Sequence, residues 1–266
     1  MTEREEKIIK KPEEKKPSLW QRMKKPLAAG LLGASLLLHP AKKADAVGFA
    51  FARDPPYYAS EIIEKKYPTG WKLLVKVDKH QGGEIDIDDS LGIKLNQSAI
   101  NYFKKKYEET KDPDALYLWV YSVYSLAGYE QTFEKTEERC MEAMKIIDER
   151  LKEEPYDFHF IDLKLTIYRN LAVAYYKGYI KDPRAVAWGH VDFSKIDFYK
   201  RKSIEYCNKY KEYLKEVKKI LDKIEICLFK DFNYTQKIVE DTKKEYIKDS
   251  EKDDIKIQHI LEELKE

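Results

Sequence analysis

The residues of this chain whose spacing best suits chemistry form an acidic run with side-chain oxygens at alternate positions. Asp86, Asp88 and Ser90 stand at the first, third and fifth positions of a calcium-binding loop. Such a loop needs glycine at its sixth position and a bidentate glutamate at its twelfth, where this chain has Leu91 and Gln97. A site without that glutamate would bind calcium weakly. The sequence therefore favours a solvated strand face here and predicts no metal ion.

Histidine offers no second metal site. The chain has five histidines, and no two of them have the i, i+4 spacing of a zinc site on a helix or stand at zinc-finger spacing from a cysteine. The sequence also lacks a G-x-S-x-G turn, a P-loop and a G-x-G-x-x-G motif. We therefore expect no cofactor and no catalytic activity.

The cysteines are odd in number: Cys140, Cys207 and Cys227. Cys207 and Cys227 fall on one expected helix, where the 20 residues between them correspond to about 30 Å. The Cα atoms of a disulfide lie within about 7 Å of each other, so these two cannot pair within the helix. All three are expected to be small core residues. The alternative is a single bridge from Cys140 to one of the others.

Tyrosine is the compositional oddity, with 20 residues in a chain of 266. Two sets have the helical spacing i, i+4 and i+7: Tyr117, Tyr121 and Tyr124, and Tyr206, Tyr210 and Tyr213. One interpretation places these rings in a core, with their hydroxyls reaching its rim. The other makes them an aromatic groove for a partner's apolar or helical segment, since tyrosine is a favoured hot-spot residue. The second interpretation predicts a protein- or peptide-binding face at Tyr117, Tyr121 and Tyr124.

The order of residues 22–46 resembles a secretory signal. A basic start at 22–25 precedes the apolar run 27–38, and Ala44 and Ala46 supply the small residues of a cleavage site. The run is shorter than the ~20 residues of a transmembrane helix, and the alternative is a buried helix of a cytosolic fold. The signal predicts an extracytoplasmic protein, either secreted or anchored to a membrane through this segment.

Charge separates the N-terminal part of the chain from the rest. Residues 1–21 form a highly charged tail that we expect to be disordered. Residues 1–46 carry 11 Lys and Arg against 6 Asp and Glu, whereas the whole chain has a net charge of +2. The rest of the chain is therefore slightly acidic. This argues against nucleic acid as a partner, because a nucleic-acid-binding domain shows a basic face.

The elements that must position these residues are mostly helices. Within 71–95, a strand-like run at 71–77, a Gly-Gly turn and the alternating residues 84–88 are typical of a β-hairpin. Apolar residues then recur in steps of three and four, which marks helices that pack lengthwise on one another. Caps and breakers place these helices at 57–66, 96–110, 114–128, 130–153, 156–177, 194–229, 234–248 and after Ser250.

Two stretches 50 residues apart resemble the first helix of a tetratricopeptide repeat. In the first stretch Trp119, Gly128 and Pro155 match the repeat pattern loosely, and in the second Asn170–Tyr176 is the closest match. The spacing is longer than the period of about 34 residues in that family. The resemblance covers about 112–228 and implies stacked antiparallel helix pairs. A plain antiparallel helical bundle is the alternative.

The sequence thus predicts an all-α protein, an antiparallel helical repeat or helical bundle with a small N-terminal β-hairpin. Its expected function is protein–protein interaction or scaffolding outside the cytoplasm, without catalysis. The alternative is a helical domain that binds a small ligand or a metal ion in its interior. The expected parts are the tail 1–21, the signal or anchor 22–46, the hairpin segment 47–95, the helical-repeat-like domain 96–229 and the C-terminal helices 230–266.

Overall fold

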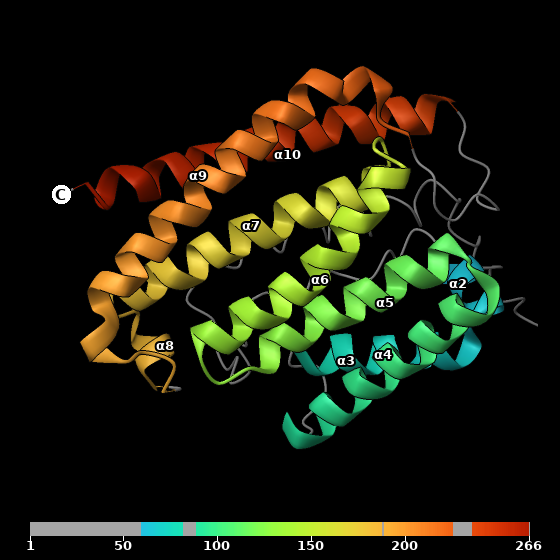
Figure 1. Cartoon of the computed structure of the whole chain (residues 1–266), viewed down its shortest axis with the longest axis horizontal. Coiled ribbons are helices and arrows are strands. Elements are labelled where there is room, and N and C mark those ends of the chain that lie inside the picture. The colour runs from blue at the N-terminus through green and yellow to red at the C-terminus, as the bar shows by residue number, and fades with distance from the viewer. Residues whose placement is uncertain (1–59, 82–88, 188, 226–235, 266) are drawn as a thin grey trace, which may run out of the picture.

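The structure is a computed structural model, and it describes residues 60–81, 89–187, 189–225 and 236–265 (Figure 1). Several predicted features lie outside the described residues: the charged tail 1–21, the signal or anchor 22–46 with Ala44 and Ala46, and the acidic positions Asp86 and Asp88. The predictions made for them stay predictions.

The described residues form helices and no strand. The helices are α2 (Ser60–Lys66), α3 (Pro68–Gln81), α4 (Asp89–Thr110), α5 (Pro113–Leu126), α6 (Phe133–Glu153), α7 (Phe158–Tyr179), α8 (Pro183–Ala187), α9 (Ile196–Ile220) and α10 (Gln236–Glu263). Three short 3₁₀ turns join them, namely η2 (Ala127–Tyr129), η3 (Phe193–Lys195) and η4 (Leu221–Lys223). The all-α prediction is confirmed for this part of the chain.

Each long helix packs against the next long helix along the chain, from α3 and α4 onward through α5, α6, α7, α9 and α10. In addition, α5 contacts α7, and α7 contacts α10. In Figure 1, α9 and α10 lie side by side at the top of the molecule, and α3 and α4 lie together at the bottom. This serial stacking is compatible with a helical repeat.

The strand predicted at 71–77 is wrong, because these residues belong to α3. The buried residues Tyr67, Trp71, Leu74 and Val77 follow one another in steps of four, three and three, which is a helical stripe. Packing of this stripe on α4 outweighs the strand preference of the valines. The alternating residues 84–88 lie outside the described part, so nothing tests the second strand.

Each of the three central helices begins at a capping side chain. Asp112 caps α5, where its carboxylate accepts a hydrogen bond from the Asp114 N–H at 3.0 Å and Pro113 occupies the first turn. Thr132 caps α6, and Asp157 caps α7. Oxygen-bearing side chains stabilise helix starts by satisfying otherwise unpaired N–H groups, so these helices begin within three residues of the predicted positions.

The end of α9 and the start of α10 differ from the prediction. α9 ends at Ile220 rather than continuing to residue 229, and η4 follows it. The chain then turns at Glu225, whose N–H donates to the Tyr156 carbonyl at 2.8 Å and whose carbonyl accepts from the Phe158 N–H at 2.9 Å. These bonds replace a further helical turn. Ser250 does not begin a new helix but lies buried within α10.

Asn96 and Gly178 also play roles that the sequence did not indicate. Asn96, which the sequence predicts as the cap of the helix 96–110, instead lies fully buried inside α4. Its amide can donate to the Ser122 carbonyl and accept from the Leu126 N–H, both at 2.9 Å. Gly178 does not end α7 but lets it approach its neighbours, because a Cβ there would come within 2.7 Å of the Phe133 ring. Both residues serve close helix packing.

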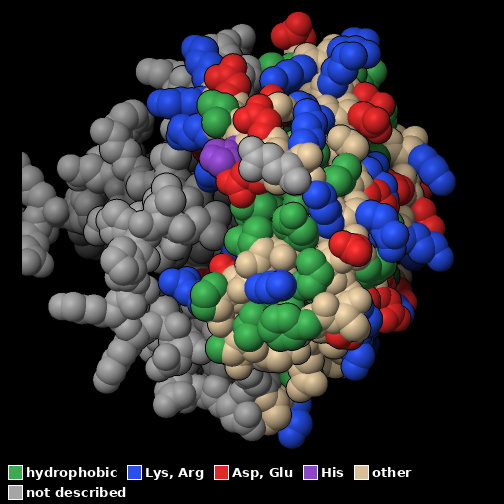
Figure 2. Space-filling view, turned by 90° about the vertical axis from the view of Figure 1, so that its left-hand side faces the viewer, with side chains coloured by type: hydrophobic (Ala, Val, Ile, Leu, Met, Phe, Trp, Pro, Cys, Tyr) green, Lys and Arg blue, Asp and Glu red, His purple; other side chains and the backbone are tan. Residues whose placement is uncertain are grey.

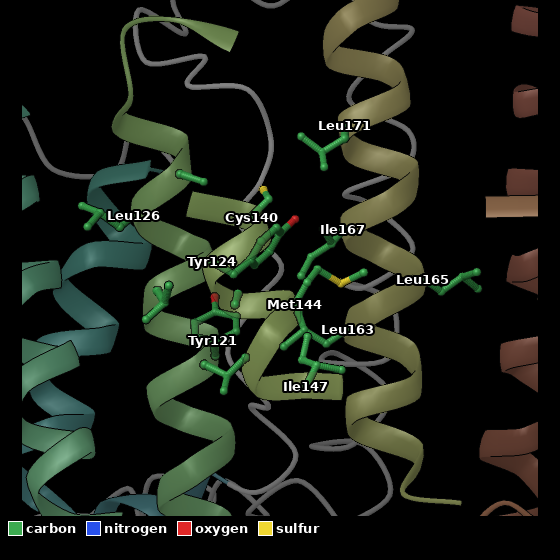
Figure 3. Packing of buried hydrophobic residues seen from close by; sticks show 14 of the residues in the cluster. Tyr121, Tyr124, Leu126, Cys140, Met144, Ile147, Leu163, Leu165, Ile167 and Leu171 are labelled. Carbon is green, nitrogen blue, oxygen red and sulfur yellow. The ribbon is translucent and has the colours of Figure 1, made fainter. Parts of the chain in front are cut away.

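The main hydrophobic core runs through α5, α6 and α7. Figure 3 shows Tyr121 and Tyr124 of α5 pointing toward Met144 of α6 and toward Ile167 of α7. Leu165 points to the other side of α7 in the same view and is still only 5% exposed. Since α7 buries side chains on both sides, it is the middle layer of the stack.

Candidate functional site

The three tyrosines predicted to bind a partner lie in the core. Tyr117, Tyr121 and Tyr124 are 5%, 3% and 0% exposed. The Tyr117 ring packs edge-on against Phe160, with ring centroids 5.7 Å apart, and the Tyr124 hydroxyl accepts a hydrogen bond from the Asn170 amide at 2.6 Å. In this structure, these side chains offer almost no surface to a partner.

The second tyrosine set lies on α9 and is also mostly buried. Tyr206 and Tyr210 are each 1% exposed, whereas Tyr213 is partly exposed. The rings of Tyr206 and Tyr175 are nearly parallel, at 2°, with centroids 6.1 Å apart. Tyr168 stands between Tyr206 and Tyr213, with centroids 6.5 Å and 6.0 Å from theirs. The aromatic stripe therefore joins α7 to α9.

A carboxylate on α6 accepts hydrogen bonds from two tyrosines of this aromatic stripe. Glu137 accepts hydrogen bonds from the phenols of Tyr175 and Tyr206 and an ion-paired hydrogen bond from Lys202 Nζ at 2.8 Å. Burial raises the pKa of the Glu137 carboxyl, but these three donors outweigh burial and hold the pKa below its usual value. Burial, reinforced by Glu137, raises the pKa of both phenols. Each group is satisfied, which suits a structural joint between three helices.

The described cysteines are free and buried. Cys140 and Cys207 form no disulfide, as the core interpretation predicts, and Cys227 lies outside the described residues. Burial raises the pKa of the Cys207 thiol to about 11 and that of the Cys140 thiol further still. Thiols of this kind are poor nucleophiles, since the thiolate is the reactive form.

Neither the histidines nor the acidic residues of the described part gather into a metal site. His159 is buried, with its ring 5.5 Å from that of Tyr117. His190 packs beside Phe133, with centroids 6.0 Å apart, and burial lowers the pKa of its imidazole. His259 lies at the surface, 2.9 Å from a carboxylate oxygen of Glu263. Ser90 is an exposed residue in the first turn of α4.

A buried polar corner with two atoms that lack hydrogen-bond partners lies at the start of α7. The side chain of Asp157 is 0% exposed, and its nearest cation is Arg150, whose Nη2 lies 3.6 Å from Oδ2. Neither Asp157 Oδ2 nor Arg150 Nε has a hydrogen-bond partner. Burial outweighs the guanidinium and raises the pKa of the Asp157 carboxyl to about 6. This corner lies beside the backbone hydrogen bonds to Glu225, which connect the start of α7 to the segment that follows α9.

The second half of α10 rests on a face formed by α7 and α9, called here the α10-binding face. Its polar residues are Arg169 and Tyr176 of α7 and Tyr210 and Lys211 of α9. Arg169 pairs with Asp253, Tyr176 donates to Glu263, Tyr210 donates to the Ser250 carbonyl at 3.4 Å, and Lys211 Nζ donates to Gln258 Oε1 at 2.6 Å. Ile257 and Ile260 of α10, and Leu264 directly after it, are buried. The face thus holds the second half of α10 through both apolar and charged contacts.

One hollow in the surface has a volume of about 350 Å³. All of its lining residues come from α6: Met141, Met144, Lys145, Asp148, Glu149 and Lys152. A small-molecule site usually brings polar groups together from several elements inside a concave pocket. A hollow along a single helix lacks that convergence.

The end of the molecule that carries α8 shows some apolar surface. In Figure 2, which faces this end, hydrophobic side chains lie between basic and acidic ones. Ile180 and Phe193 are 46% and 60% exposed. Single exposed apolar side chains are ordinary on protein surfaces, so they do not by themselves define a site. Within the described part of the chain, every helix is too short or too polar to span a lipid bilayer.

Sequence reasoning missed Glu137 and Asp253 as organising groups. Glu137 was one of 48 acidic residues, and only its position beside the apolar stripe of α6, next to Thr136, set it apart. For α10, the signal was the spacing of Asp253, Ile257, Ile260 and Leu264 on one helical face. Comparison of the chain with protein-family models, with curated proteins and with solved structures gives no match in any of the three.

Proposed function

We propose that this chain is a helical scaffold that binds a protein partner outside the cytoplasm and catalyses no reaction. The location rests on the signal-like order of residues 22–46 and on Ala44 and Ala46. The scaffold role rests on the serial stacking of long helices. Stacked helix pairs of the tetratricopeptide type, which 112–228 resembles, offer extended surfaces to other proteins.

The observation that carries the proposal is the way in which the α10-binding face holds α10. A pair of long helices, α7 and α9, accepts the second half of a third helix, α10. Laying the apolar side of a helix into a groove is a general mode of protein recognition. A chain that already does this with its own helix has the surface that the proposed function needs.

A second candidate, an interior site for a small ligand or metal ion, has weaker support. Such a site in a bundle uses polar or acidic side chains that project inward from facing helices. Where α6, α7 and α9 meet, the acidic group is Glu137, and two phenols and an ammonium group already occupy its oxygens. A ligand would have to displace all three.

The proposal can be tested by crosslinking in the native compartment. A photo-reactive amino acid is placed at Lys215 on α9 and, as a control, at Lys105 on α4, both exposed. The proposal expects a discrete crosslinked partner from position 215, in a fraction that external protease can reach, and none from position 105. A protein confined to the cytosol, or crosslinks of equal yield from both positions, would contradict it.

A further inference from the structure

We infer that the α10-binding face is a receptor for an acidic amphipathic helix of a partner protein, and that α10 is a resident occupant which this helix replaces. The inference rests on the proposed function and names its site and partner class. It is carried by the contacts of α10, which combine a short apolar stripe with a specific pattern of charges.

The apolar contacts define the shape of the ligand. Ile257, Ile260 and Leu264 are 0%, 8% and 1% exposed. Their spacing of three and four places them on one side of a helix, and Ile255 on another side is 70% exposed. A replacement helix therefore needs three apolar residues at i, i+3 and i+7.

The charged contacts define the chemistry of the ligand. Arg169 pairs with Asp253, four residues before the first buried isoleucine, and the two side chains are only 31% and 13% exposed. Tyr176 donates to the carboxylate of Glu263, and Lys211 donates to Gln258. The receptor thus supplies a cation and two further donors, and it calls for carboxylates near both ends of the apolar stripe.

The geometry also points to replacement of α10 by a partner helix rather than to simple release of α10. The backbone bonds between Glu225 and residues 156 and 158 close the preceding helices before α10 begins, so removing α10 leaves this closure intact. Removal would, however, leave Arg169 half-buried without its carboxylate. An unpaired cation in a partly buried place is costly, so a helix that brings its own carboxylate is favoured over an empty face.

The test uses the full-length chain and a fluorescent peptide of residues 246–266 as the probe. In the wild-type chain, α10 competes with the peptide, so binding should be weak. The double variant Ile257→Asp and Leu264→Asp weakens α10 in its own chain, and the dissociation constant of the peptide should fall at least tenfold. Adding Arg169→Gln should raise it again at least tenfold. Ile255→Asp, on the exposed side of α10, is the matched control and should leave binding at the wild-type level.

Any one of the following results would overturn the inference. The double variant could lose its cooperative melting transition, which would make α10 an integral part of the core. Peptide binding could fail to improve in the double variant, which would show that the face is not a receptor. The peptide could also bind equally well after Arg169→Gln, which would show that Arg169 does not recognise its charge. Light scattering could instead show a dimer that exchanges α10, which would make a second copy the ligand. A crosslinked partner without any peptide exchange would leave the proposed function standing and refute only this site.

Discussion

The phenol of Tyr206, on α9, donates a hydrogen bond to the carboxylate of Glu137, on α6. The two helices both pack on α7, whose Tyr175 donates to the same carboxylate. A single side chain of α6 is thus the point at which three helices are joined. Because the Glu137 side chain is only 17% exposed, its hydrogen bonds are shielded from competing water.

Replacing Glu137 by glutamine should weaken this joint. The amide cannot accept from the two phenols and pair with Lys202 as the carboxylate does, and hydrogen bonds to charged groups contribute about 1.5–3 kcal/mol each. We expect Glu137→Gln to lower the free energy of unfolding by about 1–3 kcal/mol at pH 7, measured by urea denaturation. Glu134→Gln, which removes a surface pair with Lys195, should change it little. Equal effects of the two variants would refute the proposed role of Glu137 in joining the three helices.

The same joint should make the protein sensitive to acid. The pKa of Glu137 lies below the ordinary 4.5, so its stabilisation is complete above that pH and is lost as the pH falls through the lowered pKa. The difference in unfolding free energy between wild type and Glu137→Gln should therefore shrink below pH 4.5. A difference that does not change with pH would show that packing, not charge, produces it.

Asp157→Asn should change the free energy of unfolding at neutral pH in the direction opposite to Glu137→Gln and raise it. The folded-state pKa of Asp157 is raised from 3.8 to about 6, so the carboxyl favours folding at low pH and disfavours it as the pH rises through 6. Asparagine also caps helices well. The variant should be more stable than wild type at pH 7.5, by about 3 kcal/mol at most, and this gain should vanish near pH 4. A less stable variant at pH 7.5 would mean that the attraction of Arg150 outweighs burial.

Alanine substitutions should show whether the tyrosines of α5 are core residues or form a binding surface. Leu165→Ala should cost about 2–5 kcal/mol, and Tyr121→Ala should lower the melting temperature by a comparable amount, because both side chains are at most 5% exposed. Ile220→Ala should cost less, since Ile220 is only partly buried. Leu91→Ala, 45% exposed, is the control. A stable Tyr121→Ala variant that loses its partner would restore the binding interpretation.

Gly178→Ala should destabilise the protein even though alanine favours helices by about 1 kcal/mol over glycine. Its Cβ would come within 2.7 Å of Phe133 and 3.0 Å of Tyr199, and overpacking a core costs about 1–3 kcal/mol. Adding Phe133→Leu should recover part of the loss in a thermal melt, because it makes room for the methyl group. If the double variant is simply the sum of two losses, the two sites are not coupled through this contact.

The mature chain should begin at Val47. Ala44 and Ala46 place small residues where a signal peptidase requires them, so Edman sequencing or mass spectrometry of the native protein should find the new N-terminus there. An intact residue 1 on a soluble cytosolic protein would refute export, and an intact one on a membrane-bound protein would favour an anchor.

The central helices could be predicted because local and tertiary signals agree in them. Asp112, Thr132 and Asp157 provide caps, and the apolar stripe of each helix faces the core. In α3 the two signals conflict. The run Trp71–Val77 has the composition of a strand, whereas the spacing of its buried residues and its packing on α4 are those of a helix.

The polar contacts could not be predicted for a different reason. The meeting of Glu137 with Tyr175 and Tyr206 depends on the rotation of three helices about their axes, and no local pattern encodes that rotation. Asp253 and Arg169 are 84 residues apart, so the sequence shows the acidic side of α10 but not the cation that receives it.

The serial arrangement of the helices bears on how the chain acquires its structure. Each long helix finds its main neighbour directly before or after it in the sequence, and chains with such short-range contacts close small loops and fold fast. The molecule can therefore assemble progressively, one helix adding to the last as the chain emerges from a ribosome or a translocation pore. Because α10 follows α7 and α9 in the chain and packs on both of them, translation order leaves the α10-binding face open until α10 itself has been made.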